Sequence, residues 1–380
     1  MMHSKLEQMC LLQVRLYINQ KIQLKQFKIC ETLSEAEMVA VNSAEHIAMS
    51  HAIKIAQSND APIGPNPRVG CVILNSEGEY LAQGYHKGRG TRHAEIEAIQ
   101  STDLKLMGST AVLTLEPCLR LDRDTDCTRE LIKAGIKKVI IAQVDVTSQS
   151  RFGAKYLTEH GIEVINEVML EEASALNPWL TIAMDQQRPY LRLKIATSLD
   201  GKVATNSGSS KWITGIESRN LVHNLRSESH AIITSVKTTL LDNSSFTARI
   251  SDSEMHLQQP NLHLLGSESI PLDHPIFNAK REVSHYQSIE LDDVLQKLWD
   301  RQELSVLVEA GPKLSTAFIR SGLVNELFWF TAPIIIGADG LSAIDTLGVN
   351  DIKEALRPHL KSHSRIGSDF LSIYQFAVSA

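Results

Sequence analysis

Three residues of types that bind zinc occur at short spacing in the first half of this 380-residue chain. His93, Cys118 and Cys127 supply one imidazole and two thiolates, a donor set that suits zinc. Three protein ligands leave a fourth position for water, and zinc lowers the pKa of such a water from about 15.7 towards roughly 7. Glu95 then serves as a catalytic acid and base that is not itself a ligand. The set predicts a catalytic metal site.

The prediction depends on the combination rather than on any single residue. A lone His or Cys at a helix start is usually structural, and a Glu in a first turn often only answers the helix dipole. Here His-Ala-Glu at 93–95 opens a predicted helix, Thr-Leu-Glu-Pro-Cys at 114–118 follows a predicted strand, and Cys127 opens another helix. Each ligand is therefore expected at the end of a regular element, where three such residues can meet.

Composition restricts the remaining function classes. Apolar residues make up 43% and charged residues 22% of the chain, which is ordinary for a soluble globular protein. The net charge of -6 argues against a surface that neutralises a phosphate backbone, so no nucleic-acid partner is expected. Five scattered cysteines favour a reducing, cytoplasmic setting. Neither a signal peptide nor a membrane-spanning segment is evident.

The chain is long enough for two domains. We expect an unimportant extension over 1–39, a first domain over 40–185 and a second over 186–380, with the boundary near Arg188-Pro189. In the first domain, helices and strands alternate, which predicts an α/β sandwich with a largely parallel sheet centre. The expected helices cover 44–57, 93–100, 127–134 and much of 166–188, and the expected strands cover 69–74, 111–115 and 138–142.

The second half is less regular. Extended segments are expected over 190–196, 305–309 and 327–336, whereas 243–290, rich in Ser, His, Pro and Asn, predicts no element. A Gly-x-Gly-x-x-Gly motif after a strand is absent, so a Rossmann-type cofactor site is not supported.

At this point the sequence resembles the bifunctional riboflavin-biosynthesis deaminase/reductase family over roughly 40–380. The first-half matches are Pro-Asn-Pro at 65–67, Val-Gly-Cys-Val-Ile at 69–73, Gly-Tyr-His at 84–86 and the two motifs above. In that family the second cysteine also lies nine residues after the first, unlike the Pro-Cys-x-x-Cys of nucleic-acid deaminases. The second-half matches are Leu-Lys at 193–194, Ser-Leu-Asp-Gly-Lys at 198–202, Ser-Lys-Trp-Ile-Thr at 210–214, Leu-Arg at 225–226 and Val-Glu-Ala-Gly-Pro at 308–312.

The resemblance implies an α/β chain with a cytidine-deaminase-like three-layer domain followed by a dihydrofolate-reductase-like domain, with zinc and NADPH as cofactors. It implies self-association and a small phosphorylated pyrimidine as substrate, with Asn66 among the substrate contacts. By the same resemblance NADPH lies along Ala196, Trp212, Thr214, Thr238, Asp242, Gly311 and Pro312, and the ribose-phosphate substrate meets Ser210, Arg226, Arg249 and Glu309. A glycine directly after a strand lets backbone N–H groups approach a phosphate, and arginines bind phosphate in bidentate fashion.

Several loops depart from the family pattern. Between the two cysteines only Arg123 keeps its place, and Asp122, Asp124 and Asp126 are expected to repel a substrate phosphate. Gly64 replaces a frequent His, and the segments 145–148, 235–238 and 242–246 are also altered.

Two-step catalysis is the leading hypothesis: hydrolytic deamination of 2,5-diamino-6-(5-phosphoribosylamino)pyrimidin-4(3H)-one, then NADPH-dependent reduction of the ribosyl to a ribityl chain. A divergent enzyme with one activity or a related pyrimidine substrate, and a non-catalytic zinc-binding protein of the same fold, are the alternatives. Retention of Glu95 argues against the last, because a structural zinc site does not need it.

Overall fold

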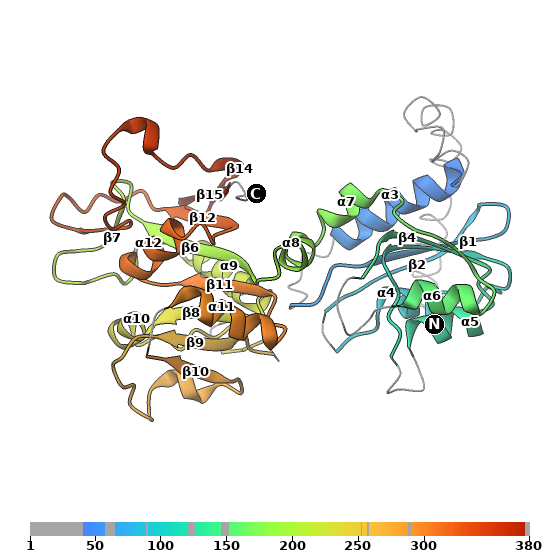
Figure 1. Cartoon of the computed structure of the whole chain (residues 1–380), viewed down its shortest axis with the longest axis horizontal. Helices are drawn as coiled ribbons and strands as arrows, with labels where there is room; N and C mark the ends of the chain where they lie inside the picture. The colour runs from blue at the N-terminus through green and yellow to red at the C-terminus, as the bar shows by residue number, and fades with distance from the viewer. Residues whose placement is uncertain are drawn as a thin grey trace, which may run out of the picture. The chain divides into compact units, whose positions relative to one another are not determined.

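The computed structural model divides into two compact units between Thr181 and Ile182, within helix α8 (Pro178–Gln186) (Figure 1). It describes residues 41–57, 65–88, 90–120, 126–145, 152–251, 253–256, 258–287 and 290–376. The expected extension over 1–39 lies outside the described residues, as do Gly64, residues 121–125 and residues 146–151. In the described part of the chain, no helix is long and apolar enough to cross a membrane.

The first unit contains a five-stranded sheet in the order β2-β1-β3-β4-β5. Only β3, β4 and β5 run parallel, whereas β1 pairs antiparallel with both β2 and β3. The expectation of a largely parallel centre is therefore only half correct, because the short connection from β1 to β2 permits only a hairpin. The strands are β1 (Gly70–Leu74), β2 (Tyr80–Tyr85), β3 (Thr110–Leu115), β4 (Lys138–Gln143) and β5 (Glu163–Ile165).

Helices cover both faces of this sheet and complete three layers. Val72 and Leu74 of β1 pack towards α3 and α7, while Cys71 and Ile73 face α4, α5 and α6, as alternation along a strand requires. The helices are α3 (Ser43–Gln57), α4 (Ala94–Gln100), α5 (Cys127–Lys133), α6 (Gly153–Glu159) and α7 (Leu170–Ser174).

The helical segment expected over 166–188 consists of two helices, α7 and α8. Between them the Asn177 side chain accepts from the Arg68 N–H (2.7 Å) and donates to the Arg68 carbonyl (2.9 Å). Pro178 then starts the next helix, where a missing N–H costs nothing.

The second unit contains an eight-stranded sheet in the order β10-β9-β8-β11-β6-β12-β15-β14. The strands from β10 to β12 are parallel, and β15 and β14 add an antiparallel edge. The strands are β6 (Tyr190–Thr197), β8 (Ala231–Ser235), β9 (Asn261–Leu265), β10 (Val283–Tyr286), β11 (Ser305–Glu309), β12 (Glu326–Thr331), β14 (His359–Ile366) and β15 (Asp369–Gln375). A separate two-stranded sheet pairs β7 (Lys202–Ala204) with β13 (Leu341–Ser342).

One expectation for this unit is corrected, and one segment that the sequence left uninterpreted contains strands. The strand expected over 327–336 ends at Thr331, two residues before Pro333, which has no N–H to donate to a neighbouring strand. The segment 243–290, for which no element was predicted, contributes β9 and β10. Polar residues hide the pattern there: His263 in the middle of β9 is fully buried and pairs with Glu303 (2.8 Å).

The helices of the second unit are α9 (Ile216–Ser227), α10 (Val236–Asp242), α11 (Leu291–Asp300) and α12 (Pro312–Arg320). The last strand holds the start of α9, because buried Asp369 of β15 accepts from the Gly215 N–H (2.7 Å) and the Ser218 hydroxyl (2.6 Å). Ligands of open parallel sheets bind beyond the carboxyl ends of the strands. Lys194 near the end of β6, Ser235 at the end of β8 and Glu309 at the end of β11 lie on that side.

Candidate active sites

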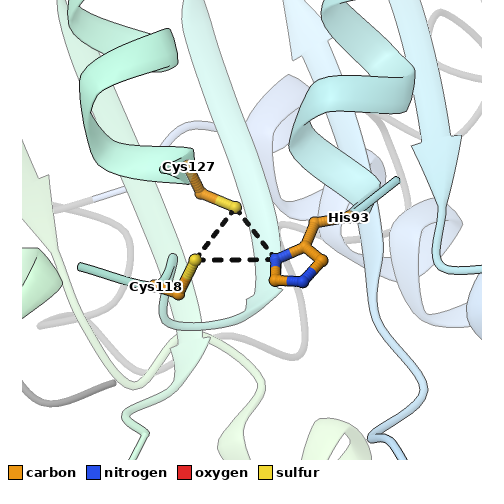
Figure 2. Close-up of side chains that lie close together, drawn as sticks. All are labelled: His93, Cys118 and Cys127. Atoms are coloured by element: carbon orange, nitrogen blue, oxygen red, sulfur yellow. Dashed lines mark hydrogen bonds between the residues drawn. The ribbon is translucent and has the colours of Figure 1, made fainter. Parts of the chain in front are cut away.

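In the first unit, the three predicted metal ligands converge. The Nδ1 atom of His93 lies 3.1 Å from the Cys127 sulfur and 3.6 Å from the Cys118 sulfur, and the two sulfurs are 3.4 Å apart. Figure 2 shows the three side chains pointing towards one another. Ligand atoms around a tetrahedral zinc ion stand roughly 3.5 to 3.8 Å apart. The donor set and its spacing therefore fit zinc after shifts of less than about half an ångström.

The predicted proton carrier lies next to this triangle. Glu95 is in the first turn of α4 and is buried, and its Oε2 has no hydrogen-bond partner among the described residues. Burial raises the pKa of Glu95 to about 7, against the opposing effect of His93. An unpaired buried carboxylate oxygen is costly, and this one lies beside three converging ligand atoms.

The hydrogen bond between the two cysteines separates their protonation states. It lowers the pKa of Cys118 to about 4 and raises the pKa of Cys127. The pair thus favours the thiolate form of Cys118, and thiolates are the form that binds metal.

Asp126 has a different role from the one predicted from the sequence. We expected it to repel a substrate phosphate, but its buried carboxylate caps helix α5 by accepting from the Arg129 N–H (2.9 Å) and pairs with the Arg129 guanidinium (2.8 Å). The negative charge of Asp126 is thus balanced within the protein, by the N-terminus of α5 and by Arg129. Asp122, Arg123 and Asp124 lie outside the described residues.

Two further residues fix the turn that carries Cys118. Glu116 accepts from the N–H groups of Asp145 (2.9 Å) and Ala154 (2.8 Å), and so ties the end of β3 to the start of α6. A Cβ on Gly153 would lie 2.0 Å from the Pro117 carbonyl oxygen, so only glycine permits this close approach.

The predicted substrate contact Asn66 is held by a histidine to which the sequence had given no role. The Asn66 side-chain amide lies 2.9 Å from Nε2 of His86, while Nδ1 of His86 lies 3.1 Å from the Arg92 carbonyl. The carbonyl requires Nδ1 to carry the proton, so Nε2 accepts from Asn66. The His86 ring also meets His93 edge-on, with centroids 5.5 Å apart.

In the second unit, the structure brings predicted substrate residues together around Glu309. Arg226 binds its carboxylate in bidentate fashion, at 2.5 Å from Nε to Oε1 and 3.0 Å from Nη2 to Oε2. Lys194, to which no role was assigned from the sequence, lies 3.5 Å from the same carboxylate. Burial alone would raise the pKa of Glu309, but the two cations outweigh burial and lower it to about 2.

Arg249 joins this cluster through a turn at 245–247. It donates to the hydroxyl groups of Thr247 (3.0 Å) and Ser245 (3.2 Å), while Arg226 donates to the Thr247 carbonyl (3.1 Å). Arg281 supports the same turn by donating to the Ser245 and Phe246 carbonyls. The sequence gave no signal for Arg281, because it lies in the segment without a predicted element.

The predicted cofactor residues lie around α10, on β6 and on the surface near Trp212. Around α10, Ser210 donates to Asp242 (3.4 Å), and the Gly311 N–H donates to the Thr238 hydroxyl (3.1 Å) just before Pro312 opens α12. Ala196 is on β6. On the surface, Arg219 lies 4.4 Å from the ring centroid of exposed Trp212 and donates to the Thr214 carbonyl (2.6 Å).

Comparison with known proteins agrees with this division. Residues 36–143 match the family of the cytidine and deoxycytidylate deaminase zinc-binding region, and residues 189–372 match the RibD C-terminal domain. The chain is 34% identical to riboflavin biosynthesis protein RibD of Aquifex aeolicus, covering 86% of this chain and 97% of that one. For the Escherichia coli protein of the same name, identity is 33%, with 84% and 96% covered. The solved structure of Acinetobacter baumannii RibD (form 2) aligns with a TM-score of 0.76 and 30% identity, covering 87% and 98%.

These observations define the class: a zinc-dependent deaminase joined in one chain to a reductase with a dihydrofolate-reductase-like fold. The chain belongs to the RibD family of riboflavin biosynthesis. It is a bifunctional enzyme that catalyses a deamination and a reduction, with zinc and NADPH as cofactors, and the single-activity and non-catalytic alternatives are not favoured.

Proposed function

We propose that the first unit deaminates the diaminopyrimidine ribose phosphate named above at the site formed by His93, Cys118, Cys127 and Glu95. The observation that carries this proposal is the unpaired Glu95 oxygen beside three converging ligand atoms. His93, Cys118 and Cys127 would hold a zinc ion, which would supply Lewis acidity for the activation of water. Glu95 accepts a proton from the attacking water and delivers a proton to the leaving amine, so that oxygen replaces nitrogen on the ring and ammonia departs.

Asn66 is proposed to orient the pyrimidine ring for this step. Because its amide donates one hydrogen to His86, its carbonyl oxygen and second hydrogen remain to meet ring atoms. His86 acts on Asn66 rather than on the reacting carbon, and its neutral state is favoured by burial, which lowers its pKa.

For the second unit, we propose that Ser210, Arg226, Arg249 and Glu309 meet the ribose phosphate. NADPH then lies along Ala196, Trp212, Thr214, Thr238, Asp242, Gly311 and Pro312. In support, Thr238 and Asp242 lie on α10 directly after β8, and Glu309 and Gly311 lie at and just beyond the end of β11. Glu309 occupies the fork of Arg226, so a substrate phosphate that uses those N–H groups must displace this carboxylate.

The remaining expectations are proposals of the same kind. We propose a deaminase domain over 40–185, a reductase domain over 186–380, self-association and a cytoplasmic location. No nucleic-acid or membrane partner is proposed; the net charge of -6 disfavours contact with a polyphosphate surface.

A mass-spectrometric assay tests the proposed sequence of reactions. Zinc-loaded protein is incubated with the diaminopyrimidine ribose phosphate, first without and then with NADPH. We expect an amine-to-oxygen exchange without NADPH and a gain of two hydrogens once NADPH is added. No exchange by protein that contains stoichiometric zinc would contradict the substrate assignment.

A further inference from the structure

A second connection, besides the chain itself, links the two cysteine ligands. The buried Asp126 carboxylate uses its two oxygens differently: Oδ1 accepts from the Arg129 N–H (2.9 Å) and the Thr128 hydroxyl (2.6 Å). Oδ2 accepts from the Arg120 N–H (3.1 Å) and from Nη1 of Arg129 (2.8 Å). The same Nη1 also donates to the Arg120 carbonyl (3.1 Å).

These bonds close a ring across the segment between the cysteines. Arg120 follows Cys118 by two residues, and Asp126 directly precedes Cys127. Both backbone polar groups of Arg120 are therefore held by the Asp126–Arg129 pair, which we call the staple. The Thr128 N–H reinforces it with a longer bond to the Cys118 carbonyl (3.4 Å).

We infer that the staple is a positioning device that keeps the two thiols at metal-binding distance. This inference rests on the proposed zinc site. Without the staple, Cys118 on its turn and Cys127 on helix α5 would have to be brought into fixed positions when the metal binds. This ordering would weaken the affinity for metal. Groups that orient metal ligands typically change metal affinity or activity by about 10- to 100-fold.

Two ordinary explanations account for only part of this geometry. A helix N-cap needs one side-chain oxygen, and Oδ1 already fills that role. An exposed ion pair within one helix contributes little, whereas the Asp126 side chain has no exposed surface. Neither explains why the Arg129 guanidinium also reaches the carbonyl of Arg120, outside the helix.

Two substitutions separate the staple from the cap. Asp126→Asn keeps an oxygen for the Arg129 N–H, but its amide nitrogen cannot accept from Arg120 or from the guanidinium. Arg129→Gln leaves the cap and the core of α5 in place, so a loss of metal binding in this variant does not report unfolding. Lys133→Ala is the matched control, an exposed residue of the same helix that forms an ion pair with Glu130 (3.6 Å).

The readout is Co²⁺ titration of the full chain, followed by thiolate-to-cobalt absorption and by competition with a chelator. We expect about tenfold or more weaker binding in Asp126→Asn and Arg129→Gln, with an altered absorption band, and no further loss in the double variant. Lys133→Ala should bind as the wild type does, and all variants should keep their reductase rate.

Each other outcome has a definite meaning. Wild-type cobalt affinity and spectra in both Asp126→Asn and Arg129→Gln would overturn the inference. A wild-type chain that shows no thiolate absorption with cobalt would instead refute the proposed zinc site.

Discussion

The two sites of this chain satisfy their polar groups in different ways. In the first unit, Oε2 of Glu95 has no hydrogen-bond partner among the described residues, and three metal-binding atoms face one another. In the second unit, the Glu309 carboxylate is paired with both Arg226 and Lys194. In the deaminase site, the cost of burying the Glu95 carboxylate is therefore offset when a metal ion and a substrate bind. In the reductase cluster, neighbouring side chains already neutralise the charge of Glu309.

This difference predicts whether a substitution in each site changes mainly catalysis or mainly the free energy of unfolding. A group left unpaired in the folded protein contributes little to holding it together, so its removal should affect catalysis. A buried charge with two partners is costly to remove, because its partners then remain buried and unpaired. Substitutions at Glu95 and Glu309 should therefore give opposite profiles of activity and stability.

Glu95→Gln should produce the largest effect. The amide cannot carry the proton, so we expect the deaminase kcat to fall by roughly 10²- to 10⁴-fold, while the rate of reduction of the deaminated substrate stays unchanged. Steady-state kinetics on each step, with zinc content measured in parallel, checks this. Glu97→Gln on the same helix, where Glu97 pairs with Lys87 at the surface, serves as the control. Equal losses of deaminase kcat in Glu95→Gln and Glu97→Gln would contradict the role of Glu95 as the proton carrier.

Glu309→Gln should mainly destabilise the second unit. Loss of one partner from a buried ion pair costs about 3–5 kcal/mol, and here two cations lose their counter-charge. Urea unfolding followed by tryptophan fluorescence measures the change in the free energy of unfolding. Glu282→Gln, which breaks an exposed pair with Arg301, should cost under about 1 kcal/mol. If Glu309→Gln cost as little as this control, Glu309 would not stabilise the second unit and the contrast with Glu95 would be wrong.

The smallest effect is a difference in pH dependence. The folded pKa of Glu309 is about 2 and its ordinary value is 4.5. Because the folded value is lower, the stabilisation is complete above pH 4.5 and is lost as the pH falls from 4.5 towards 2. We expect the free energy of unfolding to fall more steeply over this range in the wild type than in Glu309→Gln. Urea titrations at a series of pH values measure both slopes, and parallel curves would argue against the shifted pKa.

The metal site was the part that the sequence could predict best. Its ligands stand at the ends of short, strongly patterned elements, and the structure brings all three together as expected. The expectation for Asp126 failed for a physical reason. An aspartate before a helix is either a cap or a free charge, and here the outcome depends on Arg129 and Arg120, whose meeting the sequence does not reveal.

The reductase cluster was harder to predict because its contacts are distant in sequence. Without the family resemblance, nothing in the residues linked Lys194, Arg226 and Glu309, which come from β6, α9 and β11. Arg281 and strands β9 and β10 were missed for a related reason: buried polar residues such as His263 mask the apolar run that marks a strand.

The capping of α9 by Asp369 has a consequence for the order in which the two halves mature during synthesis. All three zinc ligands and the whole first unit precede residue 182, so this half can close and take up its metal while the ribosome is still making the rest. The helix that carries Arg226 is fastened by the last strand, which is also inserted between β12 and β14. The reductase site therefore cannot form until β15 has been synthesised, so a nascent chain acquires its two sites in the order in which the two reactions are used.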